Sequence, residues 1–593
     1  MRCAFKPRPL NPVSRHPALR SLWLVLVLSA TFCTAIHASA TLSVWPEFAS
    51  VHTNATAQFA ATLTGSTAAE TWLINGIPGG NSAVGTVSTN GLYTAPSAVP
   101  TGTTVMLTAS AAGADPFNVV VAISTGASFY VSTNGNDTAV GTSASPWKTI
   151  QHAANTAIAG DTVYVEAGTY NESINLPNSG SPTAGSIIFR NYPGQAAIVS
   201  GTGVPCCGSS VQGLFNITGN QSYLILYGFQ IENYTSNNVN NEPAGIYVSG
   251  SGRYIQIVNS TVHGITETAG AGGNAHGIGF YGTAAAPLSN ITLMGNNVYG
   301  MVTGNSETIT IEGNVDGFSV VGNSVHDNNN IGIDATGFYG TGPAGSDQAR
   351  NGVISGNTVY NITSLHNPAY NGLGADGIYC DGCTAVTIER NLVYACDLNI
   401  EAASENAGRY STYVTIANNV VYGGNLAGIS IGGYASTVGG SQNIAIVNNT
   451  LFENNTTGGG GDFQIQYHAS SNLFENNIVY AGSYGVMVNG IVDSTARPVK
   501  LDYNLYYTTA SHNFYWQGAE YNTFMVYRDV STQDAHSLFL NPDFQPQNYD
   551  VTAASPARNA GNFTLGSADY GTLDFAGNPR TTGSTINIGA YQQ

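Results

Sequence analysis

The sequence predicts an all-β chain in which a small β-sandwich precedes a long parallel β-solenoid. One observation behind this prediction is a motif with a fixed asparagine that recurs along the middle of the chain. The other is an earlier segment of short alternating runs separated by turn residues. The composition agrees, because 42% of the 593 residues are hydrophobic and only 8% are charged. Disordered chains lack this apolar content, and coiled coils need many more charged residues.

Residues 1–40 are typical of a secretory signal peptide. A stretch with five basic residues precedes the short apolar run 22–30 and a small-residue cleavage site at 38–40. Cleavage removes those five of the 16 basic residues and no acidic one, so 11 basic residues remain against 34 acidic ones, a net charge of −23. We therefore expect a secreted, cell-surface or periplasmic protein without a membrane span. The acidic balance excludes nucleic acid as a partner, since that needs a basic face.

Residues 41–125 are rich in threonine, valine, alanine and glycine, and their short strands predict the antiparallel sandwich. The segment Trp72–Asn81, followed by Gly91–Pro96, resembles bacterial Ig-like modules of secreted proteins. The resemblance implies a module that spaces or attaches other domains.

One helix is expected, over Pro146–Ala159, with Ser145 as its N-cap and Gly160 at its end. This passage and the following Gly160–Tyr164 resemble the N-terminal cap of right-handed parallel β-helix proteins, many of which act on polysaccharides. The predicted β-helix then covers residues 126–510, and the helix would close its open end.

The motif apolar-x-x-Asn-x-Val-Tyr recurs eight times at intervals of 27 to 34 residues, which fits one coil of a three-sided solenoid per interval. In stacked coils its asparagines would form a ladder of paired side-chain amides. The ladder positions are Asn296, Asn323, Asn357, Asn391, Asn419, Asn449, Asn477 and Asn504.

A second motif, Gly-Ile-x-apolar-x-Gly, follows and predicts another parallel sheet whose isoleucines face the core. The alternate, outward positions carry acids only in the central coils, at Glu312, Asp334, Asp381 and Glu401. Four carboxylates on adjacent outward rungs repel one another unless a ligand, proton or metal is shared. We therefore expect the functional site there.

The favoured hypothesis is a glycoside hydrolase that needs no cofactor, with Asp381 and Glu401 as the catalytic pair and Asp334 positioning water or tuning a pKa. One coil and two residues separate the pair, so their Cα atoms should be about 8 Å apart. The partner would be a polysaccharide or oligosaccharide, bound by a monomer. The residues expected to contact it are Glu312, Asp376, Tyr379, Tyr281, Glu405 and Arg409.

Two alternatives stay open. A polysaccharide lyase acting on a uronate-containing glycan could bind Ca²⁺ at Glu312, Asp334 and Asp381. No lysine lies between Lys148 and Lys500 to serve as its base, and the acidic chain opposes an anionic substrate. A non-catalytic glycan-binding surface protein, or adhesin, would also suit the Ig-like module and the repeats.

The passage from Gly374–Cys383 through Asp397–Glu405 resembles a stretch that recurs in secreted β-helix proteins with carbohydrate activity. The resemblance to this pectate-lyase-like superfamily covers residues 129–510 and implies a fold and a broad substrate class, but no particular reaction. Residues 511–593 resemble a C-terminal region found on such proteins, of the choice-of-anchor type.

Five cysteines follow the signal peptide, an odd number that leaves at least one thiol or an intermolecular bond. Cys380 and Cys383 form a lone C-x-x-C, without a second pair to complete a zinc site, so we expect a structural role.

Overall fold

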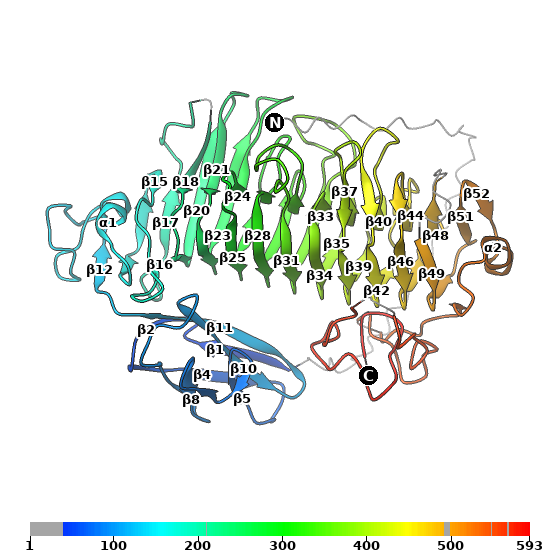
Figure 1. Ribbon diagram of the computed structural model, residues 1–593, viewed down its shortest axis with the longest axis horizontal. Helices are drawn as coiled ribbons and strands as arrows, with labels where there is room; N and C mark the ends of the chain where they lie inside the picture. The colour runs from blue at the N-terminus through cyan, green and yellow to red at the C-terminus, as the bar shows by residue number, and fades with distance from the viewer. Residues whose placement is uncertain (1–39, 209, 492–498, 547, 566–568, 593) are drawn as a thin grey trace, which may run out of the picture.

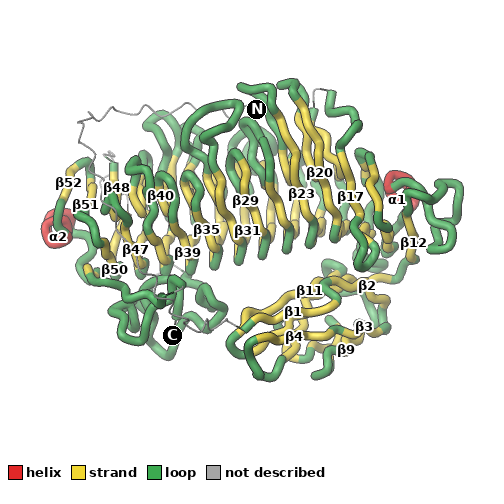
Figure 2. Tube along the Cα trace, turned by 180° about the vertical axis from the view of Figure 1, so that it is seen from behind, coloured by secondary structure: helices red, strands yellow, loops and turns green. Residues whose placement is uncertain are grey.

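The computed structural model describes residues 40–208, 210–491, 499–546, 548–565 and 569–592. Within them, a long β-solenoid carries a small β-sandwich and an irregular C-terminal segment on the same side (Figures 1 and 2). The predicted fold class, a parallel β-helix preceded by a small sandwich, is confirmed. The predicted signal peptide lies outside the described residues except for Ala40 and stays a prediction. No helix in the described part of the chain combines the length and the apolar character that crossing a bilayer requires.

The sandwich, residues 41–124, consists of three small sheets with the strand orders β1-β4, β2-β11-β10-β5-β6 and β3-β9-β8-β7. Its strands are β1 (Thr41–Trp45), β2 (Phe48–His52), β3 (Thr56–Gln58), β4 (Ala60–Thr64), β5 (Thr71–Ile74), β6 (Ile77–Pro78), β7 (Gly80–Asn81), β8 (Gly85–Val87), β9 (Leu92–Thr94), β10 (Thr104–Ala111) and β11 (Ala114–Ser124).

Three parallel sheets form the walls of the solenoid. The first, called the docking sheet, contains β12 (Ser128–Val131), β13 (Thr162–Val165), β16 (Ile187–Asn191), β19 (Leu224–Tyr227), β22 (Arg253–Val258), β25 (Leu288–Met294), β28 (Val315–Val321), β31 (Arg350–Ser355), β34 (Thr384–Glu389), β37 (Tyr410–Thr412), β38 (Thr415–Ala417), β41 (Gly440–Gln442), β42 (Ala445–Val447), β45 (Ala469–Ser470), β46 (Asn472–Glu475) and β49 (Val499–Asp502).

The second wall, called the ring sheet, carries a row of aromatic side chains on its outer face. Its strands are β14 (Gly168–Tyr170), β17 (Ala197–Ser200), β20 (Phe229–Ser236), β23 (Thr261–Glu267), β26 (Asn297–Tyr299), β29 (Ser324–Asn328), β32 (Thr358–Ile362), β35 (Leu392–Tyr394), β39 (Val420–Tyr422), β43 (Thr450–Phe452), β47 (Ile478–Ala481), β50 (Leu505–Thr508) and β53 (Leu538–Phe539).

The third wall, called the site sheet, carries the predicted acidic positions. Its strands are β15 (Ile174–Asn175), β18 (Val211–Gly219), β21 (Glu242–Gly250), β24 (His276–Gly282), β27 (Ile309–Gly313), β30 (Ile333–Thr336), β33 (Asp376–Asp381), β36 (Leu398–Ala403), β40 (Ala427–Ile431), β44 (Gly461–Ile465), β48 (Val486–Gly490), β51 (Asn513–Trp516) and β52 (Ala519–Tyr521). The solenoid sheets thus continue beyond residue 510, where we expected the β-helix to end, to β53.

The isoleucines of the second motif stack in register along the core side of the site sheet, as predicted. Each of these isoleucines pairs with the one on the next strand, and all of them are buried. They are Ile246, Ile278, Ile309, Ile333, Ile378, Ile400 and Ile429. Because side chains alternate along a strand, this stack fixes the intervening residues on the outer face.

The predicted asparagine ladder is present and continuous from Asn296 to Asn504. In each coil the Nδ2 group donates to the Oδ1 atom of the next asparagine, at 2.9 to 3.3 Å. The same Oδ1 atom also accepts the backbone N–H of the preceding asparagine, for example that of Asn357 on Asn391 at 2.9 Å. The ladder therefore satisfies the buried polar groups at one corner of every coil and fixes the register of the stack.

The capping helix α1 (Ile150–Thr156) is shorter than the predicted Pro146–Ala159. Thr149 is its N-cap, and its hydroxyl accepts a backbone N–H of the first turn. Trp147 instead joins Val131 in a β-bridge, so the residues before Thr149 are held in extended structure. At the opposite end, α2 (Phe524–Ser531) packs beside β51.

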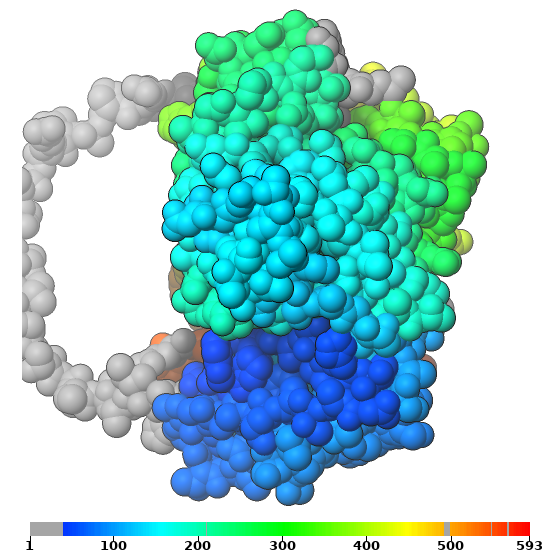
Figure 3. Space-filling model, turned by 90° about the vertical axis from the view of Figure 1, so that its left-hand side faces the viewer, coloured from blue at the N-terminus to red at the C-terminus, as the bar shows by residue number. Residues whose placement is uncertain are grey.

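The sandwich docks on the outer face of the docking sheet rather than extending away from it (Figures 1 and 3). Phe48 and Val120 of the sandwich share one buried cluster with Ile188, Ile225 and Val258 of the docking sheet. The apolar contact indicates that the sandwich and the first coils pack as one body.

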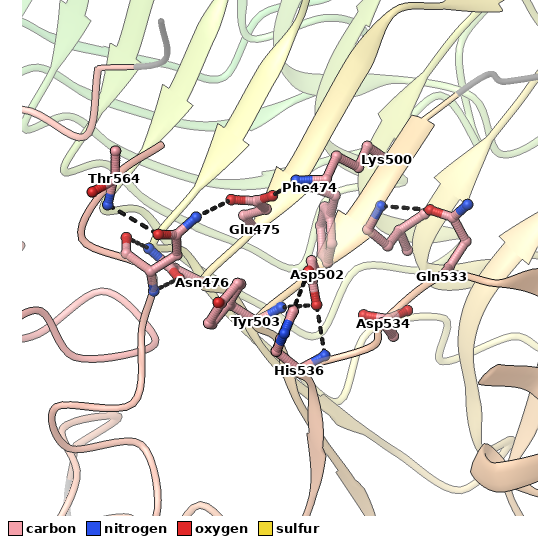
Figure 4. A network of polar contacts seen from close by, with 12 residues as sticks. Phe474, Glu475, Asn476, Lys500, Asp502, Tyr503, Gln533, Asp534, His536 and Thr564 are labelled. Atoms are coloured by element: carbon pink, nitrogen blue, oxygen red, sulfur yellow. Dashed lines mark hydrogen bonds and ion pairs between the residues drawn. The ribbon is translucent and has the colours of Figure 1, made fainter. Parts of the chain in front are cut away.

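The C-terminal segment, residues 540–592, covers the last coils through polar and apolar contacts. Figure 4 shows the buried Glu475 with Lys500 as its ion-pair partner, and Asn562 of the segment donates to the same carboxylate at 3.1 Å. Nearby, His536 Nδ1 lies 2.9 Å from Asp502 Oδ2. The docking sheet is thus covered near both ends of the solenoid, while the site sheet faces away from both attachments (Figure 1).

Candidate functional site

A pocket of about 200 Å³ lies on the outer face of the site sheet, at its central coils. It combines acidic, aromatic and hydroxyl side chains, and neither lysine nor arginine is among the described residues of its wall. The wall consists of Val211, Glu242, Asn274, His276, Tyr281, Asn305, Ser306, Glu307, Glu312, Ile331, Asp334, Thr336, Tyr339, Thr341, Tyr379, Asp381 and Glu405.

The strand register places three of its acids in a zigzag. Asp334 of β30 pairs with Thr310 of β27 on one side, and Glu312 lies two residues further along β27. On the other side, Thr336 of β30 pairs with Asp381 of β33. With strands about 4.8 Å apart and a rise of about 3.3 Å per residue, Asp334 has its Cα about 8 Å from those of Glu312 and Asp381.

Two loops complete the pocket above Asp381. Tyr339, in the loop between β30 and β31, donates its hydroxyl to Asp381 Oδ2 and lies 3.4 Å from Glu405 Oε2. Glu405, in the loop after β36, donates its backbone N–H to Asp381 Oδ1 at 2.8 Å. Asp347 holds the first loop by accepting the backbone N–H groups of Gly340 and Gly342. Both oxygens of Asp381 are therefore hydrogen-bonded by loop residues.

Burial and mutual repulsion raise the pKa values of the pocket carboxyls. Burial raises the pKa of Asp381 to about 7, against the opposing effect of the Tyr339 and Glu405 hydrogen bonds. Burial, followed by the charge of Glu307, raises the pKa of Glu312 to about 7, although a hydrogen bond from Thr341 lowers it. The pKa values of Asp334 and Glu405 lie well above their ordinary range, first through burial and then through neighbouring carboxylates. Burial in the pocket thus favours the protonated forms of these acids, and the pKa values of Asp381 and Glu312 lie near neutral pH.

A disulfide brackets Asp381. Cys380 and Cys383 are bonded to each other, and Asp381 lies between them in sequence. Ser411 accepts the Gly382 backbone N–H at 2.7 Å and donates to the Cys380 carbonyl at 2.8 Å. These contacts fix the backbone on both sides of the carboxyl. The two cysteines of the C-x-x-C pair thus form a disulfide with each other, and their structural role stays a prediction. Cys206 and Cys207 form a second disulfide, and Cys396 is a buried free thiol.

A second polar group occupies the other end of the pocket. His276 Nε2 lies 2.9 Å from Glu242 Oε1, and the Tyr281 hydroxyl is 3.2 Å from the imidazole. Glu307 Oε2 accepts the Thr310 hydroxyl at 3.0 Å. Although burial alone would lower the pKa of His276, the hydrogen bond and charge of Glu242 raise it. His276 and Glu242 thus form a charge pair at this end.

The structure brings most of the predicted site residues together in this pocket. Those on its wall are Glu312, Asp334, Asp381, Tyr281, Tyr379 and Glu405. The other three lie elsewhere. Glu401 Oε1 accepts Ser430 Oγ at 2.9 Å and Gln466 Nε2 at 3.0 Å and is not part of the pocket wall, although its charge contributes to the raised pKa of Asp381. Asp376 is buried, and it lies two residues before the core residue Ile378, on the same face of the strand.

Arg409, the third residue outside the pocket wall, stacks its guanidinium over the Phe338 ring with 5.0 Å to the centroid. The periodic reasoning therefore found outward positions correctly but could not say which of them border the hollow. No group of three or more His, Cys, Asp or Glu side chains within the described ranges is arranged to hold a metal ion, and Ca²⁺ at Glu312, Asp334 and Asp381 stays a prediction.

Among the polar residues that the sequence analysis did not assign to the site are two acids and the histidine of the pocket. Glu307 precedes β27 in a loop, where the strand repeat gives no indication of its direction. Glu242 and His276 open β21 and β24, several residues before the motif isoleucines. Both residues begin neighbouring strands of one sheet, and this shared position is the sequence signal that could have identified them as site residues.

Comparisons with known proteins agree with the fold. The sequence model of the family described as "Pel9A-like, right handed beta helix region" matches residues 129–324. The chain is 36% identical over 437 residues to YwoF of Bacillus subtilis (strain 168), which covers 72% of this chain and 92% of that protein. Over 80 residues it is 39% identical to the pectate lyase PEL9 of Emericella nidulans, which is 13% of this chain and 20% of that enzyme.

Among solved structures, pectate lyase Pel9A aligns with a TM-score of 0.42 and 16% identity, over 79% of this chain and 97% of that one. The complex of XylC with xylose aligns with a TM-score of 0.45 and 12% identity, over 79% of this chain and 98% of that one.

Proposed function

The chain belongs to the same family as YwoF of Bacillus subtilis, and on this scaffold we propose that it is a secreted polysaccharide-degrading enzyme, a glycoside hydrolase that uses the acids of the site-sheet pocket. The observation that carries the proposal is the pair of neighbouring carboxyls, Asp334 and Asp381, held in different environments within one pocket. Hydrolysis of a glycosidic bond needs one protonated carboxyl as acid and one ionised carboxylate as nucleophile or base.

Asp381 suits the role of the ionised group. The Tyr339 hydroxyl and the Glu405 backbone N–H both donate to its carboxylate, which stabilises the charged form. With a pKa of about 7, Asp381 is ionised above neutral pH.

Asp334 suits the role of the acid. It is buried, and its Oδ1 atom has no hydrogen-bond partner in the described part of the chain. Burial and then the charge of Glu307 raise its pKa well above that of a free aspartic acid, and an ionised Asp381 raises it further, so its surroundings favour the protonated form. In this scheme Glu401, which we expected to pair with Asp381, supports the next coil through Ser430 and Gln466 instead of reacting.

The test is turnover by Asp381→Asn and Asp334→Asn variants on a panel of neutral and charged glycans. Loss of either group should lower kcat by about 100-fold or more, the usual contribution of an acid or base. Asp327→Asn is the matched control, because Asp327 lies on β29 of the ring sheet, outside the pocket wall. Undiminished hydrolysis by a folded Asp381→Asn variant would refute the assignment. Glycan binding without turnover by the wild type would favour the adhesin alternative.

A second candidate is the Ca²⁺-dependent lyase. The Pel9A-like region at residues 129–324 and the short match to the pectate lyase PEL9 favour it. The pocket favours it less, since its histidine, His276, is engaged by Glu242 and has a raised pKa, which makes it a poor base. An ultraviolet-absorbing product from a uronate polymer, formed with Ca²⁺ and lost with chelator, would reverse the order.

A further inference from the structure

The pocket carries an excess of negative groups without cationic partners. Its wall includes five carboxyls besides Glu242, and none of the five forms an ion pair with lysine, arginine or histidine within the described residues. The single imidazole of the wall, that of His276, is paired with Glu242, and its one positive charge also acts on Glu307 and Glu312, so the carboxyls of the wall still outnumber the cation. The other five are Glu307, Glu312, Asp334, Asp381 and Glu405.

A separate observation indicates that a polar ligand belongs there. The hydroxyl of Thr336, a residue only 3% exposed, lines the pocket and has no hydrogen-bond partner in the described chain. Asp334 Oδ1 and Glu405 Oε1 are likewise buried and unpartnered. A buried polar atom without a hydrogen-bond partner raises the free energy of the folded protein. A bound ligand that donates hydrogen bonds to these three atoms would remove that cost.

The charge of that ligand follows from its neighbours. A uronate would add a carboxylate to a wall that already carries unpaired ones, and a neutral sugar would supply hydroxyl donors but leave the repulsion in place. A protonated amine brings three N–H donors and a positive charge together. Glu307 and Glu312 are close enough for the charge of Glu307 to raise the pKa of Glu312, and Thr336 follows Asp334 by two residues on the adjoining strand.

We propose that this end of the pocket, formed by Glu307, Glu312 and Thr336, binds the protonated amine of a hexosamine, so that the substrate is a glycan with free amino groups. The inference rests on the proposed function, because it takes the pocket as the glycan site. It leaves Asp334 and Asp381, the next rungs of the zigzag, facing the bond to be cleaved.

Binding of an ammonium group has a signature that a neutral sugar lacks. A cation beside Glu312, whose pKa is about 7, favours the ionised carboxylate, so protons leave the protein on binding near neutral pH. Net proton exchange is measured by calorimetry at pH 7 in two buffers of different ionisation enthalpy, and the protons that the free amine takes up on binding as the ammonium, calculated from its own titration curve, are added back to give the release by the protein.

The experiment titrates the Asp381→Asn variant, in which turnover is blocked, with hexosamine oligosaccharides of several linkages, each beside its N-acetylated counterpart. For at least one pair, the free amine should bind about 10-fold or more tightly, as expected for one charge-assisted hydrogen bond, and should release protons. Adding Glu307→Gln or Glu312→Gln should remove this preference. Glu232→Gln is the matched control, because Glu232 pairs with His263 on the ring sheet, away from the pocket.

Each outcome decides between the alternatives. Equal binding of amine and N-acetyl forms, or no binding of any hexosamine, overturns the inference. Ca²⁺ binding that the Glu312→Gln change abolishes, without amine preference, overturns it in favour of a metal site. Amine-selective binding without any cleavage by the wild type upholds the inference and refutes the hydrolase. Cleavage of the amine and N-acetyl forms at equal rates supports the hydrolase and overturns the inference.

Discussion

Replacing Tyr339 by phenylalanine tests the acid–base assignment most directly. The change removes the hydroxyl that donates to Asp381 Oδ2 and keeps the ring. A hydrogen bond to a charged group contributes about 1.5–3 kcal/mol, and about 1.4 kcal/mol corresponds to one pKa unit. Loss of this bond should therefore raise the pKa of Asp381 from about 7 by roughly one to two units.

The assay is the pH dependence of kcat/KM on whichever glycan the enzyme cleaves. Because Asp381 must be ionised to act, the acidic limb of the profile should move toward higher pH by the same one to two units. At pH 6 the rate of the variant should fall by roughly 10–100-fold, while at pH 9 the two enzymes should differ by only a few-fold.

The matched control is Tyr360→Phe, whose ring stacks between His326 and Tyr394 on the ring sheet. It should leave the profile in place. An acidic limb that does not move in the Tyr339 variant, or one that moves equally in both variants, would refute the role given to Asp381. A uniform loss at every pH would indicate that Tyr339 only shapes the pocket.

Three further predictions concern the supports of the site. Removing the disulfide in a Cys380→Ser, Cys383→Ser double variant should lower the free energy of unfolding by about 2 kcal/mol. It should also reduce kcat more than it changes KM, because the backbone on both sides of Asp381 is no longer held by the disulfide, and unchanged kinetics would contradict this. Burial raises the pKa of Glu312 to about 7, so the folded state binds more protons between pH 4 and 7, and the free energy of unfolding falls as pH rises through that window. Glu312→Gln should abolish up to about 3 kcal/mol of that fall, measured by urea unfolding at both ends of the window, whereas an unaltered pH dependence would contradict it. Asn391→Ala breaks four buried hydrogen bonds and should cost about 3–5 kcal/mol in chemical denaturation, a loss below 1 kcal/mol being the contrary result.

The solenoid was predictable because its coils repeat one physical requirement. Each coil must satisfy the same buried backbone groups at the same corner, so the sequence repeats an asparagine there, and the ladder from Asn296 to Asn504 follows. The capping helix was less predictable because it occurs once. Pro146 is typical of a first helical turn, but Trp147 gains a β-bridge to Val131, and this tertiary contact delays the helix to Ile150.

The strand positions of the site were predictable because they follow the repeat, and Glu405, in the loop after β36, was predicted as well and lines the pocket. Asp334 and Asp381 occupy outward positions of site-sheet strands, so the alternation of side chains along each strand was enough to predict which face they lie on. Tyr339 and Glu307 come from loops that differ from coil to coil, and no period reports their direction. Glu401 shows the converse case, because the space beside an outward position can be occupied by neighbouring side chains such as Gln466 instead of opening into a hollow.

The outer faces of the three walls favour the site sheet as the place of the proposed glycan recognition. The sandwich and the C-terminal segment cover parts of the docking sheet with apolar contacts, and the C-terminal segment also packs on the last strands of the ring sheet. On the ring sheet the aromatic side chains use their faces on one another, as in the stack of Tyr360 on Tyr394 at 4.9 Å with an interplanar angle of 2°. Rings stacked in this way offer only their edges, whereas sugar stacking needs a free face. The site sheet differs because its outward groups include unpartnered acceptors such as Asp334 Oδ1, and a donor-rich glycan is the ligand that would satisfy them.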